Sequence, residues 1–133
     1  MNTKLKKEIL DLIKAENLNC TIEEFPKKVN WIRISRRYQL SESFMEKHWK
    51  DLHKDWISGY QKLSEPFMEK HWKDLHKDWI SRCQKMTESF IEKHKDELYL
   101  DKIPKENILE KTSIERIKEL EEKTIKLINA LCT

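Results

Sequence analysis

One segment of fifteen residues occurs twice in this chain without a single difference. FMEKHWKDLHKDWIS spans Phe44–Ser58 and again Phe67–Ser81, an offset of 23 residues. A diverged third copy begins at Phe90, and a further copy, four residues shorter, lies upstream in TIEEFPKKVNWIRIS. Periods of about 20–50 residues are typical of arrays in which each unit buries its apolar face against its neighbours. This periodicity constrains the fold more than any other feature of the sequence.

The composition indicates that the repeated unit is helical. The 133 residues include one Gly and three Pro, and 38% are charged. Turn and strand residues are too scarce for a β-rich fold or a glycine-rich phosphate loop, whereas the abundant Lys, Glu and Leu favour helices. Positive and negative residues nearly cancel, leaving a net charge of +3. Such a balance is typical of solvated helix faces rather than of a dedicated nucleic-acid surface.

Each unit is predicted to contain two short helices with a break near Lys54-Asp55; one continuous helix per unit is the alternative. The first helix follows a hydroxyl residue that precedes Glu and an apolar run, which is an N-cap pattern, at Ser41, Ser64 and Thr87. The second helix is expected over Trp56–Lys62 and Trp79–Lys85, with Asp55 and Asp78 as candidate caps.

On a helical wheel that starts at Ser41, the large apolar residues of a unit share one face, opposite Glu and Lys. Tryptophans among lysines are also typical of stacking platforms for single-stranded nucleic acid and of membrane-surface helices. A unit with few aliphatic residues needs these rings for packing, however, so we expect them to be buried between units. The predicted repeat core comprises Phe44, Trp49, Leu52, Trp56, Phe67, Trp72, Leu75, Trp79, Phe90 and Leu98.

Two flanking segments lie outside the repeats. Thr3–Glu16 has apolar residues at helical spacing and is expected to cap the N-terminal side. Ser113–Leu131 has them at 3-4-3-4 spacing over barely two heptads, so we expect it to lie back on the last repeat, with homodimerisation through 113–131 as the alternative. The predicted fold is one all-α domain of stacked 23-residue helix-turn-helix units resembling an α-solenoid. It has capping helices within 1–20 and 104–133, and the repeats occupy 21–103.

The remaining chemistry-bearing residues form no catalytic or metal-binding pattern. His48 and His53 lie about 140° apart on a helix, so one helix cannot offer both to a single ion. Cys20, Cys83 and Cys132 form no CxxC pair, which is typical of free thiols in a reducing compartment. The charged N-terminus fits neither a signal peptide nor a membrane span. We therefore expect an intracellular, soluble protein that is not an enzyme and has no metal or cofactor.

One local charge asymmetry stands out. Five basic residues cluster just upstream of the identical copies, and a nucleic acid or another partner would be expected to contact them. They are Lys27, Lys28, Arg33, Arg36 and Arg37.

The frame WxxIS…QKLSExFIEKxKDxL resembles tandem repeats in uncharacterised proteins of giant DNA viruses related to mimivirus. The WxxIS element is Trp31–Ser35, QKLSE is Gln61–Glu65, and FIEKxKD is Phe90–Asp96. The resemblance covers about Thr21 to Ile103, but the two central units lack the two residues between Trp and Ile. It implies a helical repeat scaffold and a viral origin, hence a location in host cytoplasm or virion, and it supplies no activity.

From these observations we expect a non-enzymatic module for protein–protein interaction that binds a host or viral protein. The alternatives are a nucleic-acid-binding protein that uses a Lys/Arg face, and a self-assembling structural protein.

Overall fold

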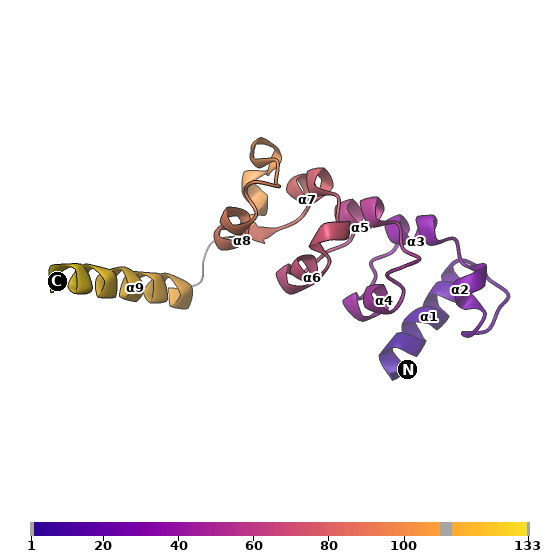
Figure 1. Cartoon of the computed structure of the whole chain (residues 1–133). Coiled ribbons are helices and arrows are strands. Elements are labelled where there is room, and N and C mark those ends of the chain that lie inside the picture. The colour runs from indigo at the N-terminus through magenta and orange to yellow at the C-terminus, as the bar shows by residue number, and fades with distance from the viewer. Residues whose placement is uncertain (1, 110–112, 133) are drawn as a thin grey trace.

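The computed structural model describes residues 2–109 and 113–132. Over these residues the chain is mostly helical, and its strands are one pair of two residues each, so the all-α prediction is confirmed. Short helices follow one another from α1 (Thr3–Ala15) at one end to α9 (Ser113–Leu131) at the other (Figure 1).

The repeats contribute two series of short helices. The first series is α2 (Phe25–Lys28), α4 (Glu42–Lys47), α6 (Glu65–Lys70) and α8 (Glu88–Lys93). The second is α3 (Trp31–Arg37), α5 (Lys54–Tyr60), α7 (Lys77–Cys83) and, in the diverged copy, the 3₁₀ turn η2 (Leu100–Lys102). Further 3₁₀ turns are η1 (Trp72–Asp74) and η3 (Lys105–Asn107). Strands β1 (Met86–Thr87) and β2 (Ile108–Leu109) pair in parallel.

The predicted N-caps of the first helices are confirmed. The hydroxyl oxygens of Ser41, Ser64 and Thr87 accept hydrogen bonds from the backbone N–H three residues later, at 3.1, 3.3 and 3.2 Å.

Each of the two identical copies has two short helices, as predicted, but the break comes earlier than predicted; in the diverged copy the second element is the 3₁₀ turn η2. Helix α4 ends at Lys47, and α5 begins at Lys54. Asp55 and Asp78 do not cap the second helices. His53 does so for α5, and its Nδ1 accepts from the Trp56 N–H at 3.4 Å; His76 caps α7 in the same way.

Most of the predicted core residues are buried: Phe44, Leu52, Phe67, Trp72, Leu75, Phe90 and Leu98. Trp49 is half-buried and packs against this core. The prediction is wrong for Trp79, which is 36% exposed, and for Trp56, which is half-buried outside the core cluster. The turn between the helices resets the helical phase, so that the following residues, Ile57 and Ile80, point inward and are completely buried.

Buried glutamines connect consecutive units through backbone hydrogen bonds. Gln84 accepts from the Leu63 N–H at 3.1 Å and donates to the carbonyls of Ser58 and Gln61 at 2.9 and 2.6 Å. Gln61 makes the same three contacts one unit earlier, to Leu40, Ser35 and Tyr38. The polar atoms of each buried amide are thus all paired. They supply hydrogen bonds to backbone groups of the preceding unit that would otherwise lack a partner.

A buried serine in each second helix makes the next connection. The Ser58 hydroxyl donates to the Lys54 carbonyl at 2.7 Å and accepts from the His76 N–H of the following unit at 2.9 Å. Ser35 bonds to His53, and Ser81 to Tyr99, in the same way. Each second helix is thereby fixed to the start of the next one.

The N-terminal helix contacts α4, and its Leu5, Ile9 and Leu12 are buried. Its Glu8 carboxylate accepts from both the N–H and the hydroxyl of Ser41, at 2.8 and 2.5 Å.

The C-terminal helix does not lie back on the last repeat, contrary to prediction. It extends away from the other helices (Figure 1), and its large apolar side chains from Ile117 to Leu131 are exposed. The predicted cap at 104–133 is therefore wrong for the part of the helix whose side chains are described. Its apolar residues recur along one helical face that the repeats leave uncovered.

Candidate interaction surface

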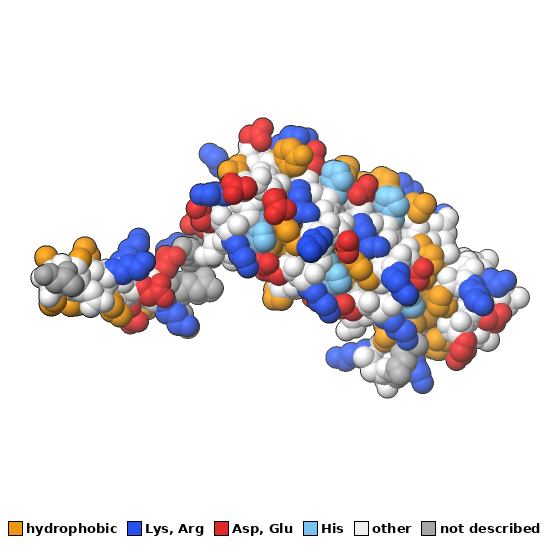
Figure 2. Space-filling model, viewed as in Figure 1, with side chains coloured by type: hydrophobic (Ala, Val, Ile, Leu, Met, Phe, Trp, Pro, Cys, Tyr) orange, Lys and Arg blue, Asp and Glu red, His pale blue; other side chains and the backbone are white. Residues whose placement is uncertain are grey.

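The second helices form one continuous outer surface. Helix α5 contacts both α3 and α7, and α7 contacts η2. Equivalent positions on this surface are occupied by Arg33, Trp56, Trp79 and Lys102. In Figure 2, hydrophobic and His side chains gather with basic ones over the region of α5 and α7. We call the aromatic residues of this surface, Trp56, Tyr60, Trp79 and Tyr99, the aromatic row.

Trp56 is held between groups from two units. The Arg36 guanidinium of the preceding second helix lies 5.3 Å from the centre of its ring. Tyr60, one helical turn later and 52% exposed, lies 5.3 Å away between ring centres. A guanidinium over an indole face is attracted by the ring quadrupole, so one face of Trp56 is covered and its orientation is fixed.

Trp79 occupies the same position one unit later and rests on a glycine instead of an arginine. A Cβ atom at Gly59 would lie 3.2 Å from Cε3 of the Trp79 ring. The absence of a side chain at Gly59 thus lets the indole lie against helix α5. The same ring is 36% exposed, so it presents apolar area to solvent from a fixed position.

Charged groups continue the surface toward η2. Asp78 accepts from Arg82 at 2.7 Å and from Lys102 at 3.4 Å. The Arg82 contact, followed by Lys102, holds the pKa of the Asp78 carboxyl below its usual value. The Lys102 ammonium also lies 4.8 Å from the ring centre of Tyr99, which is 46% exposed. These contacts order long basic side chains beside the aromatic row.

A hollow of about 280 Å³ lies beside Tyr60, between the ends of α5 and α7. Its lining includes Lys62, Cys83 and Lys85, all exposed. The aromatic row therefore borders a concavity with basic residues on its walls.

The five clustered basic residues have different surroundings. Arg33 Nε lies 2.7 Å from the buried carboxylate of Glu16, so its charge is compensated within the chain. Arg36 lies over Trp56, and the Arg37 guanidinium is 5.9 Å from the ring centre of Tyr38. Lys27 and Lys28 are exposed on the last turn of α2. The three arginines thus belong to contacts within the fold, and Arg36 adjoins the aromatic row.

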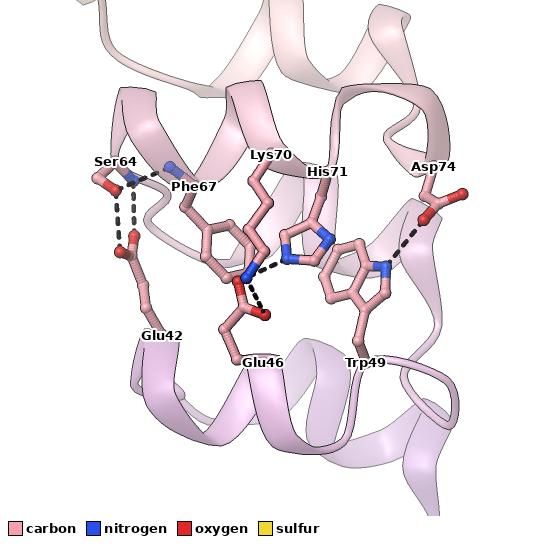
Figure 3. A network of polar contacts seen from close by, with 8 residues as sticks. All are labelled: Glu42, Glu46, Trp49, Ser64, Phe67, Lys70, His71 and Asp74. Atoms are coloured by element: carbon pink, nitrogen blue, oxygen red, sulfur yellow. Dashed lines mark hydrogen bonds and ion pairs between the residues drawn. The ribbon is translucent and has the colours of Figure 1, made fainter.

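Trp49 and His71, one from each identical copy, lie at a contact between two units (Figure 3). Glu46 of one unit accepts from His71 and Lys70 of the next at 2.7 and 3.0 Å. The Trp49 ring centre lies 4.1 Å from that of His71, and its indole N–H donates to Asp74 at 2.9 Å. Equivalent contacts join Glu69 to His94 and Lys93, and Trp72 to His94 and Glu97.

Carboxylates also bind the N-caps of the following unit. Glu42 accepts from the N–H and the hydroxyl of Ser64 at 2.7 and 2.9 Å (Figure 3), and Glu65 does the same for Thr87. Nothing in the composition pointed to these acceptors or to the buried glutamines. The signal that could have found them is their recurrence at the repeat offset.

The first of these interfaces differs. His48 is buried, and its Nε2 atom has no hydrogen-bond partner among the described residues. It packs against Phe44, Trp31 and Phe25, with ring centres 4.8, 5.1 and 6.4 Å away. Burial, followed by nearby Lys47, lowers the pKa of this imidazole. Aligning Phe25 with Phe44 places Lys27 where later units have Glu46 and Glu69.

The parts of the chain that the structure describes contain no group of three or more His, Cys, Asp or Glu side chains able to hold a metal ion. Among those residues, no helix is both long and apolar enough to cross a membrane. Comparison of the chain with protein-family models, curated proteins and solved structures gives no match.

Proposed function

We propose that the chain is a non-enzymatic scaffold of stacked helical repeats, resembling a short α-solenoid, that binds another protein through the aromatic row. The recurrence of the same glutamine, serine and glutamate contacts at successive junctions supports the stacking. Stacked units that contact mainly their neighbours provide extended surfaces for binding.

The observation that carries the binding proposal is that the Trp79 ring is exposed while it is held in place against Gly59. Trp, Tyr and Arg dominate the binding energy of protein interfaces, because large amphipathic side chains bury much area at low entropic cost. Arg36 on Trp56 and Gly59 under Trp79 hold the two indoles before any partner arrives. Preorganisation of this kind lowers the cost of binding.

The basic residues beside the row favour an acidic partner segment. Lys62 and Lys85 line the hollow next to Tyr60, and Lys102 lies at the far end of the row. We further propose an intracellular location, which the free thiols of Cys20, Cys83 and Cys132 support. A viral origin remains part of the proposal, on the basis of the repeat resemblance alone.

The test compares proteins captured from cell lysate by the wild type and by a Trp56→Ala/Trp79→Ala variant. A Lys50→Ala/Lys73→Ala variant is the control, because these exposed lysines also occupy equivalent positions in the two identical copies. A specific partner should be retained by the control and lost with the tryptophans, while far-UV circular dichroism shows that all three proteins are folded.

Capture that is insensitive to both tryptophans contradicts the assigned surface. Capture that disappears after nuclease treatment favours the nucleic-acid-binding alternative instead, for which a steep dependence on salt would be expected.

A further inference from the structure

We propose that helix α9 is a self-association element, which pairs in parallel with α9 of a second copy of this chain. The inference is independent of the aromatic row. It starts from the apolar face that the repeats leave uncovered. Six side chains of that face are 53–86% exposed: Ile117, Leu120, Ile125, Leu127, Ile128 and Leu131.

The spacing of these residues fits another helix better than a flat surface. Ile117, Leu120, Thr124, Leu127 and Leu131 alternate at intervals of three and four, which are the a and d positions of a coiled coil. Thr124 is the one polar member of the series. Its hydroxyl already donates to the Leu120 carbonyl at 2.8 Å, so the side chain enters an apolar seam without losing a hydrogen bond to water.

Charge at the border of the face favours a second copy in parallel. With Ile117 at position a, Arg116 falls at g and Glu121 at e. In a parallel pair, the g residue of one helix faces the e residue of the next heptad in the other helix, so opposite charges meet twice. An antiparallel pair centred near Glu122 instead brings Glu121 toward Glu121 and Lys123 toward Lys123 of the partner copy.

The same residues argue against a membrane surface as the occupant. Ser113–Leu131 contains no Trp, Tyr or Phe, which anchor interfacial helices. Glu121 lies between Ile117 and Thr124 along the apolar face, where a lipid surface would force its carboxylate toward acyl chains. In a helix pair this position lies at the edge and stays in contact with water.

The length of the helix sets the strength of the association. Nineteen residues span about 28 Å, so the contact falls below the roughly 800 Å² per partner of standard stable interfaces. We therefore expect a reversible dimer with a dissociation constant on the order of tens of micromolar.

The test is sedimentation equilibrium of the full chain from about 5 to 500 µM. The wild type should rise from 16.3 kDa toward twice that mass. Leu120→Glu/Leu127→Glu should stay monomeric, and Thr124→Ile should move the midpoint to a concentration at least about tenfold lower, because Ile at position a favours two-stranded pairing. Lys126→Glu, on the opposite face, is the control and should leave the midpoint unchanged.

The orientation is tested with Leu131→Cys in a Cys83→Ser/Cys132→Ser background. A parallel pair brings the two position-131 thiols together and should give a disulfide-linked dimer, which the background alone does not give.

A monomer at the highest concentration overturns the proposal, whether or not the protein binds phospholipid vesicles. A dimer that survives Leu120→Glu/Leu127→Glu also overturns it, since that dimer uses another surface. A dimer without the Leu131→Cys crosslink overturns the parallel arrangement.

Discussion

Replacement of Gln84 by Met should destabilise the protein far more than its conservative size suggests. Met has nearly the shape of Gln but cannot accept from the Leu63 N–H or donate to the carbonyls of Ser58 and Gln61. All three contacts are buried, and Gln84 is only 4% exposed. Water therefore cannot replace the lost bonds unless the two units separate.

The magnitude follows from the three backbone groups left unpaired. Each buried unpaired group costs roughly 1–3 kcal/mol, so about 3 kcal/mol is expected at the lower end of the range. This is a large fraction of the roughly 5–15 kcal/mol by which small domains are stable. Urea unfolding followed by circular dichroism at 222 nm measures the difference in free energy of unfolding.

Gln39→Met is the matched control, because Gln39 is exposed and should change the stability by no more than about 0.5 kcal/mol. If Gln84→Met lowers the free energy of unfolding by less than about 1 kcal/mol with an unchanged denaturant slope, the buried glutamines are not what joins consecutive units.

Three further predictions concern single side chains. Phe67→Ala should cost about 3–5 kcal/mol of unfolding free energy because the ring is buried, whereas Trp79→Ala should cost about 1 kcal/mol or less; equal losses in urea titrations would contradict the assigned burial. Because the pKa of His48 is lowered, its contribution to stability is complete above the ordinary value of 6.5 and is lost as pH falls through the lowered pKa. His48→Phe should therefore flatten the dependence of unfolding free energy on pH in that window. An unchanged dependence argues against a neutral buried imidazole. Burial raises the pKa of the Glu46 carboxyl, but the hydrogen bonds from His71 and Lys70 lower it by more, so the net pKa is lowered. The contribution of Glu46 to stability is therefore present above 4.5 and lost as pH falls through the lowered pKa, and Glu46→Gln should reduce the acid sensitivity by less than about 1 kcal/mol; the loss of stability must be larger at pH 7 than at pH 3.

The parts of the fold that could be predicted from the sequence are those with a local cause. A hydroxyl residue before Glu and Phe determines an N-cap within a few residues, and Ser41 and Ser64 behave accordingly. The scarcity of glycine and proline, the usual turn residues, likewise acts locally, and it argued against a fold of strands joined by tight turns.

The errors arise where the phase of one helix does not carry into the next. A single helical wheel places Trp56 and Trp79 on the core face, but the turn after His48 shifts the inward position to Ile57 and Ile80. The contact of the Trp79 ring with Gly59 could not be predicted for the same reason, since it depends on how neighbouring units are spaced.

Helix α9 shows a different limit. Its heptad spacing can be read from the sequence, but the spacing does not show whether the apolar face packs against the same chain or against another one. The exposure of Leu120 and Leu127 excludes packing on the repeats in this structure, and that choice depends on long-range geometry.

The contact of Trp49 with His71, and of Trp72 with His94, gives each of these junctions an optical signal of its own. The ring centres lie 4.1 Å apart in both pairs. The fluorescence of an indole depends on the groups in contact with it, so the emission of each tryptophan should change when the two rings separate. Variants that keep one of these two tryptophans and replace the other by Phe, compared with a variant that lacks both, would report which junction opens first during unfolding. The chain thus carries built-in probes that time the separation of its units without any added label.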